Sequence, residues 1–145
     1  MGNKISDIIG VIETGLKTIE GLSVVRRAVN PFTEPNFPAA GIVVDGSPRE
    51  IEAGSWESWP VVVLVGLVMR RGEGDEDQGI MDLVTLVLEK IKAVNDSDAP
   101  GGVIDRPRWT TWRHVQEGKP LVLMGAAIEI RVTIEGPLVT EDEEA

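Results

Sequence analysis

The one histidine of the chain, His114, is the first side chain to test for catalysis, because an imidazole exchanges protons near neutral pH. It lies in Trp112-Arg113-His114-Val115, with no serine or carboxylate at a spacing that implies a catalytic triad. We therefore expect a surface or partly covered strand histidine. One histidine cannot form a metal-binding pair, and the absence of cysteine excludes thiolate ligands, disulfides and cysteine nucleophiles.

Two acidic segments invite comparison with the loop of helix-loop-helix calcium sites. In the segment that starts at Asp75, the sixth position is Ile80 instead of glycine and the twelfth is Leu86 instead of glutamate. In the segment that starts at Asp96, the fifth and twelfth positions are Pro100 and Pro107, which offer no side-chain oxygen. We therefore expect two solvated turns and no metal site.

Glycine-containing loops give no nucleotide site either. Gly72 and Gly74 lack the third glycine of a dinucleotide fingerprint, and Gly118-Lys119-Pro120 lacks the hydroxyl residue and upstream glycine of a phosphate loop. Paired carboxylates without a pocket do not indicate acid-base catalysis. The sequence therefore predicts that the chain is not an enzyme and holds no cofactor, and a small hydrolase or metal-dependent enzyme is the least favoured alternative.

Composition indicates one globular domain. The 145 residues are 42% hydrophobic and 26% charged, which is enough apolar surface for a single core. The net charge is −10, which is the wrong sign for binding phosphate groups, and the sequence has no obvious basic stripe. We therefore expect no specific DNA binding. The chain start lacks the apolar stretch of a signal peptide, and the longest apolar run, Val61 to Met69, is too short to span a bilayer. We expect synthesis in the cytoplasm and no membrane contact.

Two segments have the spacing of amphipathic helices. Residues 3 to 20 repeat apolar side chains at intervals of three, four and seven from Ile5 to Ile19, and Gly21 supplies a helix end. Residues from about Ile80 to Val94 repeat in the same way, with acidic residues just before them, near the positive end of the helix dipole.

Strands are predicted from β-branched content and alternation. The expected strands are Leu22 to Val29, Ala39 to Asp45, a central strand from Val61 to Met69 covered on both faces, Trp109 to Val115, and a closing strand in which Ile128, Ile130, Val132 and Ile134 alternate with polar residues. Asn30 to Pro38 and Asn95 to Gly102 are expected to be loops.

This element order predicts an α+β fold, a mostly antiparallel sheet of about five strands with both amphipathic helices packed on one face. We expect residues 1–137 to form a single domain. Residues 138–145 are expected to be an acidic disordered tail, because four of the last five residues are acidic and repel one another.

The four tryptophans come as two pairs, Trp56 with Trp59 and Trp109 with Trp112. Tryptophan is enriched in binding hot spots, but it also covers small cores, and the core interpretation is slightly favoured. Trp56 is the better interface candidate, because its neighbours are glycine, serine and glutamate. The candidate interface residues are Trp56, Trp59, Glu73, Asp75, Glu76 and Asp77.

Several segments carry a likeness to a known family: the N-terminal helix, the early loop with Phe37-Pro38-Ala39-Ala40, Trp59-Pro60 before a Val-rich strand, the second helix, and Gly118-Lys119-Pro120 before a strand ending in Glu135-Gly136-Pro137. In this order they resemble phage tail terminator and minor tail proteins of the lambda U type. The resemblance covers residues 1 to 137 and rests on element order and length, without a short diagnostic motif.

The resemblance implies a structural virion protein, a tail terminator that forms a hexameric ring on the last ring of tail-tube protein and offers a surface to a head-neck protein. It implies no catalysis and no cofactor, assembly in the host cytoplasm, and a place in the phage tail. DNA would pass through the ring without specific binding, since acidic loops such as 73 to 77 would repel phosphate. Two alternatives stay open: a neck or tail-completion protein of the same virion, and a non-viral protein-binding module.

Overall fold

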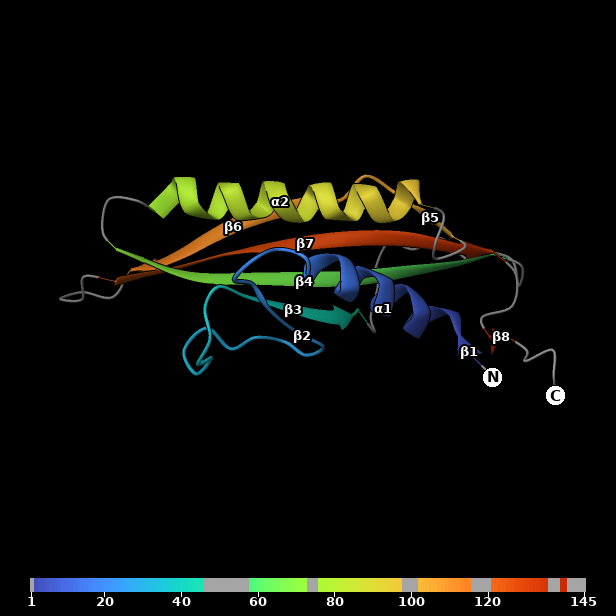
Figure 1. Ribbon diagram of the computed structural model, residues 1–145, viewed down its shortest axis with the longest axis horizontal. Coiled ribbons are helices and arrows are strands. Elements are labelled where there is room, and N and C mark those ends of the chain that lie inside the picture. Colours follow the sequence, from blue (N-terminus) through green and yellow to red (C-terminus); the bar gives the residue numbers. More distant parts are fainter. Residues whose placement is uncertain are drawn as a thin grey trace.

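Two helices pack on one face of a six-stranded sheet in the computed structural model of the chain (Figure 1). The structure describes residues 2–45, 58–72, 76–97, 102–115, 121–135 and 139–140. The elements are β1 (Gly2–Asn3), α1 (Lys4–Leu16), β2 (Ser23–Val25), β3 (Ala39–Val44), β4 (Ser58–Gly72), α2 (Glu76–Asp96), β5 (Gly102–Ile104), β6 (Arg108–Val115), β7 (Leu121–Glu135) and β8 (Val139–Thr140). Neither helix in these residues is long and apolar enough to cross a bilayer.

Helix α1 confirms the first helical prediction but is shorter at its end. Asn3 caps its start, since the side-chain oxygen accepts hydrogen bonds from the backbone N–H of Ile5 at 2.9 Å and of Ser6 at 3.3 Å. The helix ends at Leu16 instead of residue 20, because the N–H and the hydroxyl of Thr18 both donate to the carbonyl of Gly15 and tighten the chain into a turn. Gly21 then takes the left-handed conformation expected of it, with φ of 81°.

The sheet is mostly antiparallel, as predicted. Strand β4 pairs with β3 on one side and with β7 on the other, both antiparallel, whereas the short β2 runs parallel to β3. The far side of β7 pairs with β5 near one end and with β6 along the rest. The lateral order is therefore β2, β3, β4, β7 and then β5 with β6.

Strand β4 is the central strand that the apolar run predicted. Its alternate residues Val63, Val65 and Leu67 face the helices and are fully buried. On the opposite face Val62 and Val68 are buried, but Leu64 and Gly66 between them are only half-buried. The expectation of cover on both faces is therefore wrong for the middle of the strand, because both helices pack on the same face.

Helices α1 and α2 complete the core on that face. Ile8, Ile12 and Leu16 of α1 pack with Val84, Val87 and Ile91 of α2 and with the inward residues of the sheet. The alternation predicted for the last strand is confirmed, since Ile128, Ile130, Val132 and Ile134 of β7 are all buried in this core.

The opposite face of the sheet is partly covered by the segment that follows β2. A Cβ added to Gly41 would meet the carbonyl of Arg27 and the backbone of Val29, so residues 27–29 cross directly over β3. The predicted strand from Leu22 to Val29 is thus too long, because the chain leaves the sheet after Val25 to make this crossing. The predicted loop from Asn30 to Pro38 is confirmed, with a cis peptide bond between Phe37 and Pro38.

Strand β5 was not expected. The backbone N–H of Ile104 donates to the side-chain oxygen of Asn95 at 3.1 Å, and the N–H of Asp105 donates to the carbonyl of Arg131 at 2.9 Å. These bonds tie the end of α2 to the edge of β7. Strand β5 has three residues, begins at the second of two consecutive glycines and shows no alternation, so no pattern in the sequence predicts it.

Strands β1 and β8 form a small separate two-stranded sheet. Val139 and Thr140 of β8 pair with Asn3 and Gly2 of β1. Two residues of the predicted tail, 138–145, therefore join the fold. Residues 141–145, with the four acidic side chains, lie outside the described residues. The division into a domain and a disordered tail stays a prediction.

Substitution of Val65 by Asp should prevent folding. The side chain has no exposed surface, and an unpaired buried charge costs several kcal/mol out of the roughly 5 to 15 that stabilise a domain. The matched control is Leu86→Asp on α2, where the leucine is 49% exposed and the cost should stay within about 1 kcal/mol. Soluble yield and circular dichroism of the two variants decide the question, and a folded Val65→Asp protein contradicts the central position of β4.

Gly41 and Gly66 form a natural pair for a second prediction, because they lie opposite each other on β3 and β4. Gly41→Ala would push a methyl group into the backbone of residues 27–29, so we expect a loss of about 1 to 3 kcal/mol of unfolding free energy. Gly66→Ala meets no atom within 4 Å and should change stability by less than about 1 kcal/mol. Urea unfolding measures both, and equal effects would show that the crossing segment does not pack on Gly41.

Candidate functional site

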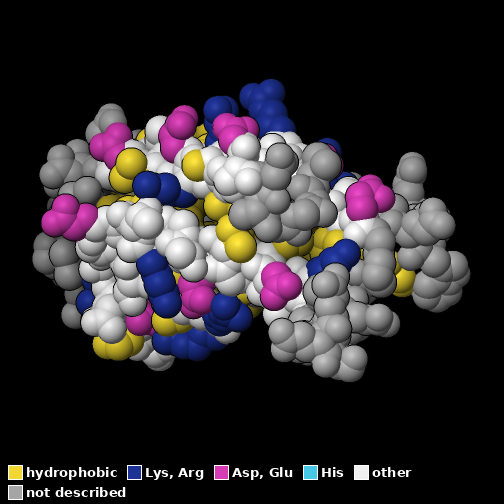
Figure 2. Space-filling view, turned by 45° about the vertical axis from the view of Figure 1, so that its right-hand side comes forward, with side chains coloured by type: hydrophobic (Ala, Val, Ile, Leu, Met, Phe, Trp, Pro, Cys, Tyr) yellow, Lys and Arg dark blue, Asp and Glu magenta, His cyan; other side chains and the backbone are white. Residues whose placement is uncertain are grey.

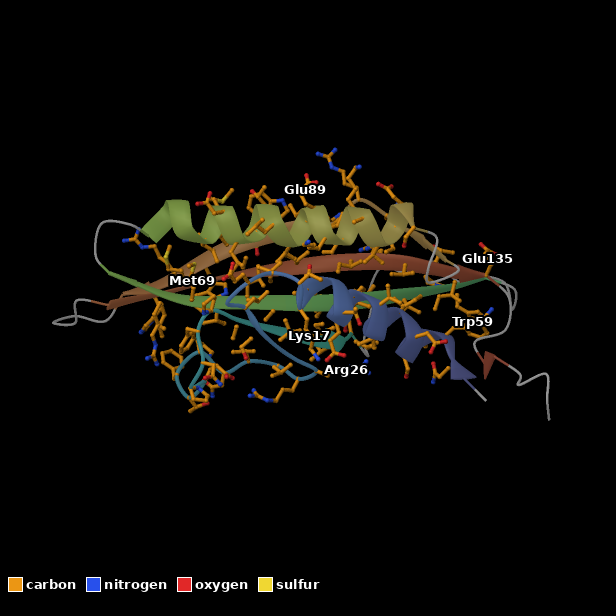
Figure 3. The ribbon with its side chains drawn as sticks, viewed as in Figure 1. Lys17, Arg26, Trp59, Met69, Glu89 and Glu135 are labelled. Atoms are coloured by element: carbon orange, nitrogen blue, oxygen red, sulfur yellow. The ribbon has the colours of Figure 1, made fainter. Side chains whose placement is uncertain are left out.

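Of the residues predicted to form an interface, Trp59, Glu76 and Asp77 belong to described elements, and these three do not come together in one place. Trp59 lies near the start of β4, opposite Ile134, and its half-buried ring packs against the hydrophobic core. Glu76 and Asp77 are the first residues of α2, which follows the far end of β4, roughly 40 Å away by the rise per residue of a strand. Trp56, Glu73 and Asp75 lie outside the described residues. Figure 3 shows Trp59 and Met69 at opposite ends of the molecule.

His114 is an exposed strand residue, as expected from the sequence. Its ring meets the ring of Phe32 edge-on, with 5.3 Å between the centroids. In the part of the chain that the structure describes, no three histidine, aspartate or glutamate side chains are grouped so that they could hold a metal ion. On the face shown in Figure 2, acidic side chains lie among basic and apolar ones.

A groove of about 430 Å³ lies between the second half of α2 and the edge of the sheet. Its floor is apolar, with Leu88 and Ile91 from the helix and Ile104 and Trp109 from β5 and β6. Charged residues of both signs stand at the rim: Glu89, Lys92, Asp105 and Arg106. Sequence analysis could not find this groove, because its two walls come from separate segments, residues 88–95 and 104–109, and neither segment has a motif.

The second surface that sequence analysis missed is a run of basic and aromatic residues on the sheet edge, residues 106–114, which we call the basic edge. It contains Arg106, Arg108, Arg113 and His114 and has no acidic residue. Trp109 and Trp112 are 40% and 38% exposed. The net charge of −10 does not reveal this local run of basic residues.

The side chains of the basic edge divide between the two faces of the sheet. Trp109 pairs with the core residue Ile128 and so points to the face that carries the helices, where it lines the groove. Trp112 pairs with Gly125 on the opposite face, and its ring occupies the space that a Cβ on Gly125 would need. The exposed side of β6 is thus flanked by one tryptophan on each face.

Two ion pairs hold the segment that crosses the back of the sheet. The guanidinium of Arg27 donates to the carboxylate of Glu34 at 3.0 Å, and this carboxylate is almost completely buried. Arg26 donates to Glu13 of α1 at 2.9 Å (Figure 3 labels Arg26). At the end of β4, the guanidinium of Arg70 lies 4.4 Å from the centre of the Phe37 ring, a cation–π contact with the same segment.

The Arg26 pair gives the protein one acid-sensitive contact. The hydrogen bond from Arg26 lowers the pKa of the Glu13 carboxyl below its ordinary value of 4.5. A carboxyl with a lowered pKa stabilises the fold above its ordinary pKa, and this contribution is lost as the pH falls through the lowered value. The contact between α1 and the segment after β2 is therefore intact at neutral pH and weakens in acid.

Comparison with known proteins gives no further guide, since no protein-family model matches the chain and no curated protein matches it. What the chain does must therefore be inferred from its own residues and surfaces. Those surfaces are the groove beside α2 and the basic edge.

Removal of the Arg27 side chain tests whether the crossing segment is fastened by a buried ion pair. In Arg27→Ala the Glu34 carboxylate stays buried without its partner, so we expect a loss of about 1 to 3 kcal/mol of unfolding free energy. Lys92→Ala is the control, because the Lys92–Asp96 pair is exposed on both sides and its loss should leave the unfolding midpoint unchanged. Chemical denaturation compares the two, and equal midpoints would contradict the role of Arg27.

Proposed function

We propose that the protein is a structural component of a tailed phage, a tail terminator that forms a ring on the end of the tail tube. The observation that carries the proposal is the difference between the two lateral edges of the sheet. On one side lies β2, three residues long and parallel to its neighbour, and on the other lies β6, eight residues long, basic and flanked by tryptophans. Two unlike edges suit head-to-tail contacts between copies, and such contacts form rings where the rotation from one copy to the next closes.

The order of elements adds support. The segments that resemble the lambda U type are an N-terminal helix, a proline-containing loop, a long Val-rich strand, a second helix and a closing strand. The structure has these elements in this order as α1, the Asn30–Pro38 segment, β4, α2 and β7. The fold is therefore compatible with the proposed role.

A ring of this protein would act without catalysis. It would bind the last ring of tube protein through one face, and growth would stop because its other face does not bind a further tube subunit. The other face would instead receive a head-neck protein. The net charge of −10 would keep DNA from adhering as it passes, since a low density of positive charge gains little counterion release. We propose a hexamer in the virion tail, assembled in the host cytoplasm.

A protein-binding module outside a virion is the second candidate. The exposed Trp109 and Trp112 on the edge strand β6 favour it, because tryptophan and arginine are among the residue types most common in binding hot spots. The two candidates differ in what they bind, so tube protein itself separates them.

Tube growth provides the test. Tail-tube protein of the same virion is allowed to polymerise with and without this chain, and tube length is measured by electron microscopy. We expect substoichiometric amounts to stop elongation and to leave a ring on one end of each tube. The variant Val65→Asp, which should not fold, is the negative control. Tubes of unchanged length without end-bound protein would defeat the proposal, and a ring that binds heads but not tubes would favour a neck protein.

A further inference from the structure

Strand β6 lies at a lateral edge of the sheet. Among the strands that the structure describes, β6 pairs with β7 alone, and residues 108–114 are all exposed. In an edge strand every second residue directs its N–H and C=O away from the sheet, and these groups can pair with a further strand. With eight residues, β6 is longer than the usual strand of about five or six residues. The edge can therefore receive an extended segment along its length.

The groove beside α2 is lined by the start of this same edge. Its volume of about 430 Å³ falls within the roughly 300 to 1,000 Å³ of ligand pockets. Trp109 belongs to both features, because it is a residue of β6 and its ring lines the groove. A strand added to β6 would direct alternate side chains to the helix face, so one side chain beside Trp109 would reach the groove. The buried Ile91 and Ile104 form the floor there, so an apolar side chain fits best.

Two arginines at the start of the basic edge determine which charge a bound segment should carry. Arg106 stands at the rim of the groove, whereas Arg108 points to the opposite face of the sheet, since its neighbour Trp109 faces the helices. Both arginines are exposed, and neither makes an ion pair with a residue that the structure describes. The carboxylate of Glu129, opposite Arg108 on β7, is bonded instead to Arg131 at 2.8 Å. Acidic residues next to the apolar one would therefore find unpaired guanidinium groups.

The net charge of −10 does not keep an acidic segment from this edge. At physiological salt the Debye length is about 8 Å, so the nearby arginines outweigh acidic residues elsewhere on the surface. The edge of a second copy is a poor occupant, because two basic edges in one ladder place like charges opposite each other. In the described part of the chain, the alternating segment 128–135 lies inside the sheet, between β4 and the strands β5 and β6. The occupant must therefore come from another protein.

We propose that the basic edge and the groove beside α2 form one binding site for an extended acidic segment of another protein. The segment adds to β6 as a further strand and places one apolar side chain in the groove against Trp109. Its acidic side chains meet Arg106 and Arg108. Main-chain hydrogen bonds to β6 supply affinity, and the groove supplies selectivity. The site goes beyond the proposed function and does not depend on the ring, because a single copy carries all of it.

A synthetic peptide with the eight-residue length of β6, in which glutamate alternates with leucine, tests the site. Its binding to the full-length protein is measured by fluorescence anisotropy. Arg108→Glu should weaken binding by roughly tenfold or more, because like charges then meet. Trp109→Ala should weaken it by a similar factor, because the groove loses a wall.

The control for these variants is Lys17→Glu, which makes the same change of charge as Arg108→Glu but lies beside β2, on the other side of the sheet. Its binding should equal that of the wild type, and circular dichroism checks that all three variants fold. A second peptide, with lysine in place of glutamate, should not bind. A glutamate peptide that does not bind the wild type, or that binds all variants equally, overturns the proposal.

Backbone methylation separates strand addition from simple attraction of charge. One version of the glutamate peptide carries N-methyl groups on its glutamates, and another carries them on its leucines. In an added strand the N–H groups of one set face β6 and those of the other set face solvent. One version should therefore lose binding while the other keeps it, and equal binding by both would contradict strand addition.

Other occupants of the edge give different results. Self-association of the pure protein that Arg108→Glu abolishes, seen by light scattering, would make the edge a contact between copies. A short DNA duplex that binds the wild type but not Arg108→Glu would make it a nucleic-acid surface. Either result would overturn the proposal of a peptide site.

Discussion

The pairing of β4 with β7 is the constraint on which the rest of the structure depends. The two strands run antiparallel in an unbroken register from Ser58 opposite Glu135 to Gly72 opposite Leu121. Because side chains alternate along a strand, this register places Val63, Val65 and Leu67 on the same face as Ile130, Ile128 and Ala126. A shift by one residue would turn every one of these side chains to the other face, so the burial of one face fixes the register.

The helices follow from that burial. Both amphipathic helices need an apolar surface, and the sheet offers a continuous one only on the side of Val65 and Ile128. Because both helices pack on this face, the segment after β2 covers part of the other face. Residues 27–29 of this segment can contact β3 closely only because Gly41 has no side chain. The half-buried Leu64 and Gly66 mark where this cover stops. The asymmetry between the two faces and the two edges is thus a consequence of how the core is built.

The helices and strands that could be predicted from the sequence are those with a periodic pattern of apolar residues. Both helices, the central strand and the closing strand were recognised, because Ile8, Val65, Val87 and Ile128 belong to repeats of the right period. The early end of α1 at Leu16 depends on the local bonds of Thr18, and the end of β2 at Val25 depends on a crossing over Gly41. These are contacts between residues that no periodic pattern connects.

The candidate surfaces were less predictable for the same reason. Trp59 was considered for an interface on residue type, but its position opposite Ile134 places it against the core. The basic edge was visible in the sequence as Arg-Pro-Arg-Trp-Thr-Thr-Trp-Arg-His, but the net charge of the whole chain concealed it. Only the pairing of β6 with β7 shows that this segment is an edge strand, and the groove beside it needs α2 as its second wall.

The proposal of a ring that ends a tail tube rests on a sheet with helices on one face and with two unlike edges. Electron cryomicroscopy of tail tubes incubated with this protein tests that inference most directly. We expect an extra layer one subunit thick at one end of the tube, with the rotational symmetry of the tube. Tube ends without added density, or protein scattered singly along the tube wall, would contradict it.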